Sequence, residues 1–250
     1  MLVLDRSGST GEGSSPPPIY YAKEGATAFV DQLDPDVDQV GLVSYATAAT
    51  LDHELASGVS GFNSVKDAID DLSDGGFTNI DDAVYKAQQE LESGRHNPEA
   101  VPVIVVLTDG IANRNHDGDW CTTWPASPTV CTDDAINQAA TAKANGTIIF
   151  TIGLSLVWDS YPDAAALARD VLQTMATQPW SSYYFETTDP PNLQGIFEQI
   201  AAIITNIFGP GSMVSGGSDG SDHLPATLAL AAVAPMLAVI PVSRLWRRRE

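Results

Sequence analysis

The chain has 250 residues, of which 44% are hydrophobic and 18% are charged. This is enough for one domain of about 200 residues with its own core, followed by a tail. The net charge is −20, and residues 1–223 carry 8 basic and 31 acidic side chains, because four of the twelve basic residues lie in the last seven positions. A body this acidic repels nucleic acid and anionic lipid headgroups and favours cations, although acidity also serves solubility alone. We therefore exclude nucleic-acid binding.

Short apolar runs alternate with amphipathic stretches along this body. The apolar runs predict strands at residues 1–4, 40–45, 50–55, 101–107, 147–153 and 183–186. Apolar residues at helical spacing predict helices over 19–33, 65–72, 80–91, 134–145, 167–175 and 193–204, the last of them capped by Asp189 before Pro190. The run at 101–107 is typical of a strand buried on both faces, and 50–55 follows 40–45 closely enough to form a hairpin at a sheet edge. The alternation predicts an α/β fold with a doubly wound, mostly parallel six-stranded sheet and helices on both faces.

The two cysteines, Cys121 and Cys131, lie ten positions apart in a stretch rich in Trp, Pro and Thr. They do not form a CxxC metal pattern, and no histidine lies at ligand spacing. In an oxidising compartment they would form a disulfide that staples a loop, whereas two free thiols are the alternative. We favour the disulfide because the tail of the chain indicates export.

The tail predicts a membrane anchor. Residues 208–223 are rich in Gly, Ser and Asp and predict a flexible spacer. A transmembrane helix is predicted over 224–243, because Leu224 begins a run of 19 residues without a charge. The arginines in the tail at 244–250 are expected to stay cytoplasmic, which makes a single-pass protein of the cell membrane with the acidic domain outside.

This topology needs an export signal, which the sequence lacks before its first strand, so we expect an N-terminal truncation. The letters LPATL also resemble a sortase-type wall-sorting signal, but Leu228 stands where that motif has Gly, which favours a simple membrane anchor.

Oxygen-bearing side chains follow two of the predicted strands and one Gly-rich loop. Asp5, Ser7 and Ser9 come after the first strand, Asp109 comes after the strand at 101–107, and Thr78 precedes a helix. Ligands of open α/β sheets bind at the carboxyl ends of the strands, so these side chains are expected to meet at one edge. An all-oxygen set suits a hard cation, Mg²⁺ above all, with Mn²⁺ and Ca²⁺ as alternatives. Taken singly, the same residues would be a cap and loop hydroxyls.

Three motifs together resemble a known family. The DxSxS pattern that begins at Asp5, the GGFTNIDDAV stretch that contains Thr78 and the TDG triplet around Asp109 resemble the von Willebrand factor type A domain over residues 1–207. In that family these pieces build a metal-ion-dependent adhesion site. The resemblance implies that Ser7, Ser9 and Thr78 contact the metal, that Asp5 and Asp109 do so directly or through water, and that Glu or Asp of a protein partner completes the coordination.

The long connection at 111–131 is expected to lie beside this metal. Arg6 and Arg114 are candidate rim residues, and Trp120 and Trp124 are candidate partner contacts. The alternative for the two tryptophans is packing onto the disulfide of their own loop. Three further side chains of the loop resemble a second ion site only superficially, and no such site is predicted for them: His116, Asp117 and Asp119.

The resulting interpretation is an extracellular, membrane-tethered module that binds a protein through a metal and is not an enzyme. One alternative is a structural subunit of a surface or pilus-like assembly, in which the metal stabilises the sheet edge. Another is a metal-dependent phosphoesterase with Asp5 as the nucleophile. The second alternative is disfavoured because such enzymes typically carry DxD, whereas Ser7 takes the third position here, and no Ser–His–Asp set or P-loop occurs.

Overall fold

The computed structural model describes residues 1–13, 15–122, 127–156 and 161–208. Trp124, the spacer from residue 209 onward, the predicted membrane span and the basic tail lie outside these ranges, so the predictions made for them stay predictions. Among the helices in the described ranges, none has both the length and the apolar character needed to cross a membrane.

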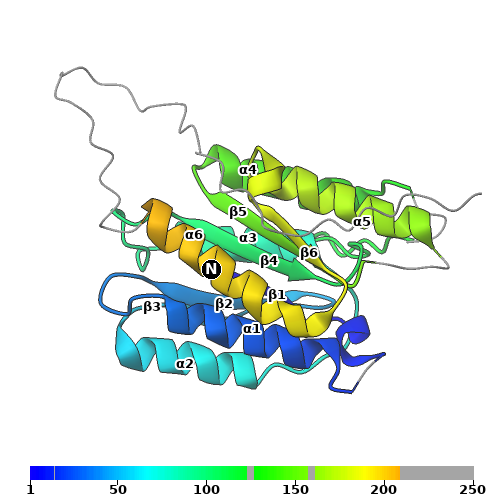
Figure 1. The fold of residues 1–250 in the computed structure, drawn as a ribbon. Coiled ribbons are helices and arrows are strands. Elements are labelled where there is room, and N and C mark those ends of the chain that lie inside the picture. The colour runs from blue at the N-terminus through cyan, green and yellow to red at the C-terminus, as the bar shows by residue number, and fades with distance from the viewer. Residues whose placement is uncertain (14, 123–126, 157–160, 209–250) are drawn as a thin grey trace, which may run out of the picture. The chain divides into compact units, whose positions relative to one another are not determined.

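Six strands form one sheet in the order β3-β2-β1-β4-β5-β6 (Figure 1). Their bounds are β1 Leu2–Asp5, β2 Val40–Tyr45, β3 Ala49–Ala56, β4 Val103–Thr108, β5 Ile148–Leu154 and β6 Tyr184–Thr187. Every neighbouring pair is parallel except β2 and β3, which pair antiparallel at one edge. The predicted six-stranded α/β sheet is confirmed, and it is mixed because of this edge hairpin.

The helices cover both faces of the sheet. Their bounds are α1 Pro18–Gln32, α2 Gly58–Asp70, α3 Ile80–Leu91, α4 Val130–Ala144, α5 Pro162–Met175 and α6 Leu193–Phe208. Figure 1 shows α1, α2 and α6 on one side of the sheet and α4 and α5 on the other. Buried side chains of α3 belong to the same core cluster as those of α4 and α5.

The two central strands are β1 and β4, and their side chains alternate between the two clusters of the core. Leu2 and Leu4 pack into the cluster under α1, α2 and α6, whereas Val3 packs into the cluster under α3, α4 and α5. Strand β4 is buried along its whole length, as expected for a strand paired on both edges and covered on both faces. This packing fixes the carboxyl ends of β1 and β4 side by side.

Three predicted helix starts lie several residues inside the observed helices, because α2 begins at Gly58, α4 at Val130 and α5 at Pro162, and one predicted helix cap was wrong. Helix α4 begins at Val130 instead of residue 134, because the backbone N–H of Thr132 donates to Thr129 Oγ1 and that of Thr129 donates to Thr132 Oγ1. This reciprocal capping box starts the helix earlier. Asp189 does not cap α6, because a 3₁₀ turn at Pro190–Asn192 comes first and its two prolines lack the N–H groups that a cap would bind.

Candidate metal centre

Asp5 ends strand β1 and is held in one orientation by two hydrogen bonds. The backbone N–H of Ser7 donates to Asp5 Oδ1 at 2.8 Å, and the Thr108 hydroxyl donates to Asp5 Oδ2 at 2.6 Å. Leu4 lies opposite Leu107 in the parallel β1–β4 pair, so Thr108 follows at the position that meets Asp5. The carboxylate is only 1% exposed. The sheet register therefore sets the position of the first predicted ligand.

Ser9 joins this group to the end of strand β4. The Ser9 hydroxyl donates to Asp109 Oδ1 at 2.8 Å, although the two residues are one hundred positions apart in the chain. Ser7 Oγ and Ser9 Oγ lie 3.2 Å apart and share a hydrogen bond. Ser7 is buried, whereas Ser9 is exposed and Asp109 is half-buried. These three residues and Asp5 form one continuous cluster whose outer end reaches solvent.

Thr78 approaches the same cluster from the loop before α3. A Cβ atom built on Gly110 would lie 3.8 Å from Thr78 Oγ1, so the hydroxyl faces the residue that follows Asp109. Ser9, Thr78 and Asp109 also line one hollow of about 1030 Å³ at this edge of the sheet. The structure thus brings all five predicted ligands to the same edge, as their positions at strand ends and in the loop predicted.

The glycines of the Thr78 loop permit this close approach. Gly76 has φ +86°, a left-handed conformation that glycine adopts without strain, and its carbonyl accepts a hydrogen bond from Gly8 N–H at 3.1 Å. A side chain on Gly76 would lie 2.6 Å from Thr47 Oγ1. The sequence between α2 and α3 therefore needs glycine here to bring Thr78 beside the first loop.

Both carboxyl groups of the cluster have raised pKa values. Burial raises the pKa of Asp5, and the hydrogen bonds from Ser7 and Thr108 only partly oppose this shift. Burial and the neighbouring Asp5 carboxylate raise the pKa of Asp109 to about 7. In the described ranges no basic side chain forms an ion pair with either residue. A buried pair of like charges without a counterion favours protonation or a bound cation.

This donor set fits a divalent cation that prefers oxygen. Two carboxylates and three hydroxyls meet the preference of Mg²⁺ for oxygen ligands with one or two carboxylates. In the part of the chain that is described, no three His, Cys, Asp or Glu side chains gather as a possible metal site. The candidate centre therefore depends on its hydroxyl groups, and the ion would keep more positive charge than in a site with three carboxylates.

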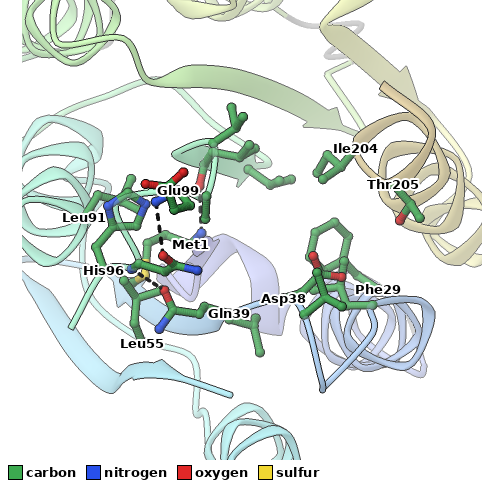
Figure 2. Close-up of a pocket in the computed structure, with 18 residues that line it drawn as sticks. Met1, Phe29, Asp38, Gln39, Leu55, Leu91, His96, Glu99, Ile204 and Thr205 are labelled. Carbon is green, nitrogen blue, oxygen red and sulfur yellow. Dashed lines mark hydrogen bonds between the residues drawn. The ribbon is translucent and has the colours of Figure 1, made fainter. Parts of the chain in front are cut away.

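A second cavity lies at the opposite end of the strands. It measures about 320 Å³ and is lined by Met1, Phe29, Val103 and Ile204 among others (Figure 2). None of the predicted site residues lines this cavity. It therefore plays no part in the candidate metal centre.

The predicted partner contacts lie at different places around the centre. Arg6 turns toward β2, where its Nε donates to Ser44 Oγ at 3.0 Å. Trp120 is 69% exposed, and Arg114 pairs with it in an isolated antiparallel bridge. The predicted disulfide is present, since Cys121 and Cys131 are bonded.

Sequence reasoning missed several residues that support the centre. Asn113 Oδ1 accepts the backbone N–H of Thr78 at 2.7 Å, and the exposed aromatic Phe77 stands next to Thr78. Phe77 could have been noticed in the sequence, because it is an apolar residue inside a loop of Ser, Asp, Gly and Thr. Asp82 in the first turn of α3 was missed as well, and its Oδ2 accepts the Ala49 N–H at 2.7 Å.

The fold and the site define a class of protein: a doubly wound α/β domain with an oxygen-rich cluster at the carboxyl edge of its central strands. The family model of the von Willebrand factor type A domain matches residues 1–199. The chain belongs to this family. Comparison with curated proteins gave no match.

Several solved structures share the fold. The type V pili tip protein Mfa5 from Porphyromonas gingivalis is 17% identical with a TM-score of 0.65, and the match covers 85% of this chain and 97% of that chain. The pilus adhesin SpaC from Lactobacillus rhamnosus GG is 16% identical with a TM-score of 0.64, and the match covers 83% of this chain and 30% of that chain. Proximal thread matrix protein 1 from the mussel byssus, in a structure with a zinc-occupied MIDAS motif, is 22% identical with a TM-score of 0.59 over 81% of this chain and 44% of that chain. The chain thus spans less than half of SpaC and of the mussel protein.

Proposed function

We propose that the chain is a metal-dependent protein-binding module of adhesion type, which binds an acidic side chain of its partner through a divalent cation. Mg²⁺ is the first candidate, with Mn²⁺ and Ca²⁺ as alternatives, and zinc is added because the mussel protein carries it at its own motif. The residues that would hold the ion are Asp5, Ser7, Ser9, Thr78 and Asp109.

The observation that carries this proposal is the pair of carboxylates at the sheet edge, which no described basic side chain neutralises. A cation at this place would remove the repulsion between Asp5 and Asp109 and replace the hydrogen bonds that now link the hydroxyls. When bound, the ion supplies an electrophilic position that can accept a carboxylate from another molecule.

Some of these residues would hold the ion in place, and others would leave it accessible to a partner. Asp5 is fixed by Ser7 and Thr108 and buried, so its orientation does not depend on solvent. Ser9 is exposed and Asp109 half-buried, and both line the hollow of about 1030 Å³ from which a partner's side chain would approach. A rigid inner residue and an accessible outer edge favour binding of a ligand from outside.

The same geometry supports a role without catalysis. A phosphoesterase that used Asp5 as its nucleophile would need a free carboxylate oxygen facing its substrate. Asp5 is 1% exposed, and each of its oxygens accepts a hydrogen bond. This arrangement favours a structural ligand of a cation over an attacking group.

We further propose an extracellular setting, with a single membrane anchor at 224–243 and a cytoplasmic basic end. The charge pattern of the tail and the disulfide between Cys121 and Cys131 support export. Assembly into a surface or pilus-like structure is the second candidate, and the fold shared with SpaC and Mfa5 supports it.

The test uses the full ¹⁵N-labelled chain and two short Gly/Ser peptides, one with a central glutamate and one with glutamine in its place. With Mg²⁺ present, the glutamate peptide is expected to shift the amide signals of Ser9 and Gly110, and EDTA should abolish the shifts. The glutamine peptide should leave these signals unchanged. Equal shifts with both peptides, or shifts that persist in EDTA, would contradict the proposal.

A further inference from the structure

The loop that follows β4 is attached directly to Thr78. The backbone N–H groups of Asn113 and Arg114 donate to the Thr78 carbonyl at 2.9 and 3.2 Å. The Thr78 N–H in turn donates to Asn113 Oδ1 at 2.7 Å. Three hydrogen bonds therefore fix the start of this loop relative to one of the candidate metal ligands.

The same loop is closed on itself and stapled to α4. The N–H of Cys121 donates to the Asn113 carbonyl at 3.0 Å, and Arg114 and Trp120 form an antiparallel bridge. The disulfide from Cys121 to Cys131 then ties the loop to the first turn of α4. Residues 113–121 of this loop consequently hold a defined place beside Thr78.

Arg114 stacks on one of two neighbouring exposed aromatic rings. Its guanidinium carbon is 4.8 Å from the centroid of the Phe77 ring, and the Phe77 and Trp120 rings are 6.3 Å apart. Phe77 is 40% exposed and Trp120 is 69% exposed. A cation over an aromatic face is stabilised and loses part of its water shell. The three side chains, Phe77, Arg114 and Trp120, are called the Arg114 cluster below.

The charge of Arg114 has no acidic partner among the described residues. Its Nη1 donates to the Gly118 carbonyl at 3.1 Å, and its buried Nε has no hydrogen-bond partner in the same ranges. By contrast, Arg95 and Arg169 each pair with a glutamate. In a chain of net charge −20, an arginine held without a carboxylate is suited to an anion that comes from another molecule.

We propose that the Arg114 cluster is a second anion-binding position, which binds a carboxylate of the partner while another carboxylate of the same segment is bound at the metal. The proposal rests on the proposed function and adds to it the chemistry of the partner. The partner would be an acidic polypeptide segment with two carboxylates, one bound at the metal and the other bound by Arg114. The Phe77 ring covers one face of the guanidinium, and Trp120 packs next to Phe77.

The net charge of the chain makes the test selective. Its overall negative field favours a lysine over a glutamate next to the metal-bound residue, so a preference for a second glutamate must come from a local positive charge. The probes are short Gly/Ser peptides with one glutamate and, at a series of separations from it, a second glutamate, glutamine or lysine. Dissociation constants are measured with the full chain in Mg²⁺.

The wild type is expected to bind the best-spaced two-glutamate peptide about two- to fivefold more tightly than its glutamine counterpart, the range of a partly exposed ion pair. Arg114→Gln should abolish this preference, and it should weaken binding of the single-glutamate peptide less than binding of the two-glutamate peptide. Arg114→Lys should keep part of the preference. Lys66→Gln removes the same charge at the remote pair with Asp31 and should keep all of it.

The outcomes separate the two proposals. If the single-glutamate peptide does not bind in a Mg²⁺-dependent way, the proposed function fails and this inference fails with it. If that peptide binds but the second glutamate gives no preference at any separation, only the Arg114 cluster is overturned. The same conclusion follows if Arg114→Gln, with an unchanged melting temperature, retains the wild-type preference.

Discussion

Asp109→Asn tests the metal centre with the smallest change of shape. Asparagine keeps the volume and the oxygen that accepts the Ser9 hydroxyl at 2.8 Å, but it removes the charge that Asp5 repels. Without metal, the variant should therefore be at least as stable as the wild type at pH 8. With metal, it should lose most of the stabilisation, because a neutral amide is a poorer ligand for a hard cation.

The size of the effect follows from linkage. Mg²⁺ at 100 times its Kd stabilises the folded state by about 2.7 kcal/mol. For a domain of roughly 200 residues, each kcal/mol raises the Tm by about 2–4 °C, so the wild type should gain about 5–10 °C. The Asp109→Asn chain should gain less than a few degrees, since it would bind the ion far more weakly.

Thermal unfolding of both full chains is followed at pH 8 in EDTA and in Mg²⁺. Asp67→Asn on α2 is the control, because Asp67 is exposed and lies outside the candidate centre, and it should keep the wild-type gain. The reasoning is refuted if Asp109→Asn unfolds well below the wild type in EDTA while retaining the full Mg²⁺ gain. That result would assign Asp109 a purely structural role.

Further predictions concern the candidate centre and the loop beside it. Without metal, the carboxyl of Asp109 has a pKa of about 7, so raising the pH from 6 to 8 should tighten Mg²⁺ binding about tenfold, as measured by calorimetry. A higher Kd for Mg²⁺ at pH 8 would contradict this prediction. In EDTA the folding stability changes with pH in the opposite direction to Mg²⁺ binding. The stability contributed by this carboxyl is present at low pH and is lost as the pH rises through about 7. Thr108→Val leaves a buried carboxylate oxygen of Asp5 without its donor and should cost about 1–3 kcal/mol in urea unfolding; no loss would show that the bond is dispensable. Gly76→Ala forces a side chain into a left-handed conformation, which should lower the free energy of unfolding by about 1–3 kcal/mol and weaken Mg²⁺ binding. Unchanged stability and unchanged Mg²⁺ affinity would contradict this prediction. Replacing Cys121 and Cys131 together by serine opens a loop of sequence separation 10 and should cost about 3 kcal/mol, whereas an unchanged urea midpoint would exclude a stabilising role.

The sequence was most informative where one local pattern decides the structure. Strand β2 has the bounds 40–45 that its apolar run predicts. The start of α4 was missed, because its capping threonines, Thr129 and Thr132, lie in a Pro- and Thr-rich segment whose polar residues hide the helix. Local composition gave no sign that two side chains of that segment bond each other's backbone.

In the candidate site, too, some positions could be predicted from the sequence and others could not. Asp5 and Asp109 could be placed at one edge because both follow central strands, and this needs only the topology of a doubly wound sheet. Asn113 and Phe77 could not be placed, because their positions depend on how two loops far apart in the sequence bond to each other. The stacking of Arg114 on Phe77 is a consequence of that contact, so only the structure reveals it.

The most direct test of the central claim is anomalous diffraction from crystals of the full chain grown with Mn²⁺. The account predicts one strong peak at the carboxyl edge of the sheet, within coordination distance of oxygens from Asp5, Ser7, Ser9, Thr78 or Asp109. The peak should be absent from crystals of Asp109→Asn. A peak at another acidic cluster, or none in well-ordered crystals with excess Mn²⁺, would contradict the claim that this edge is a metal centre.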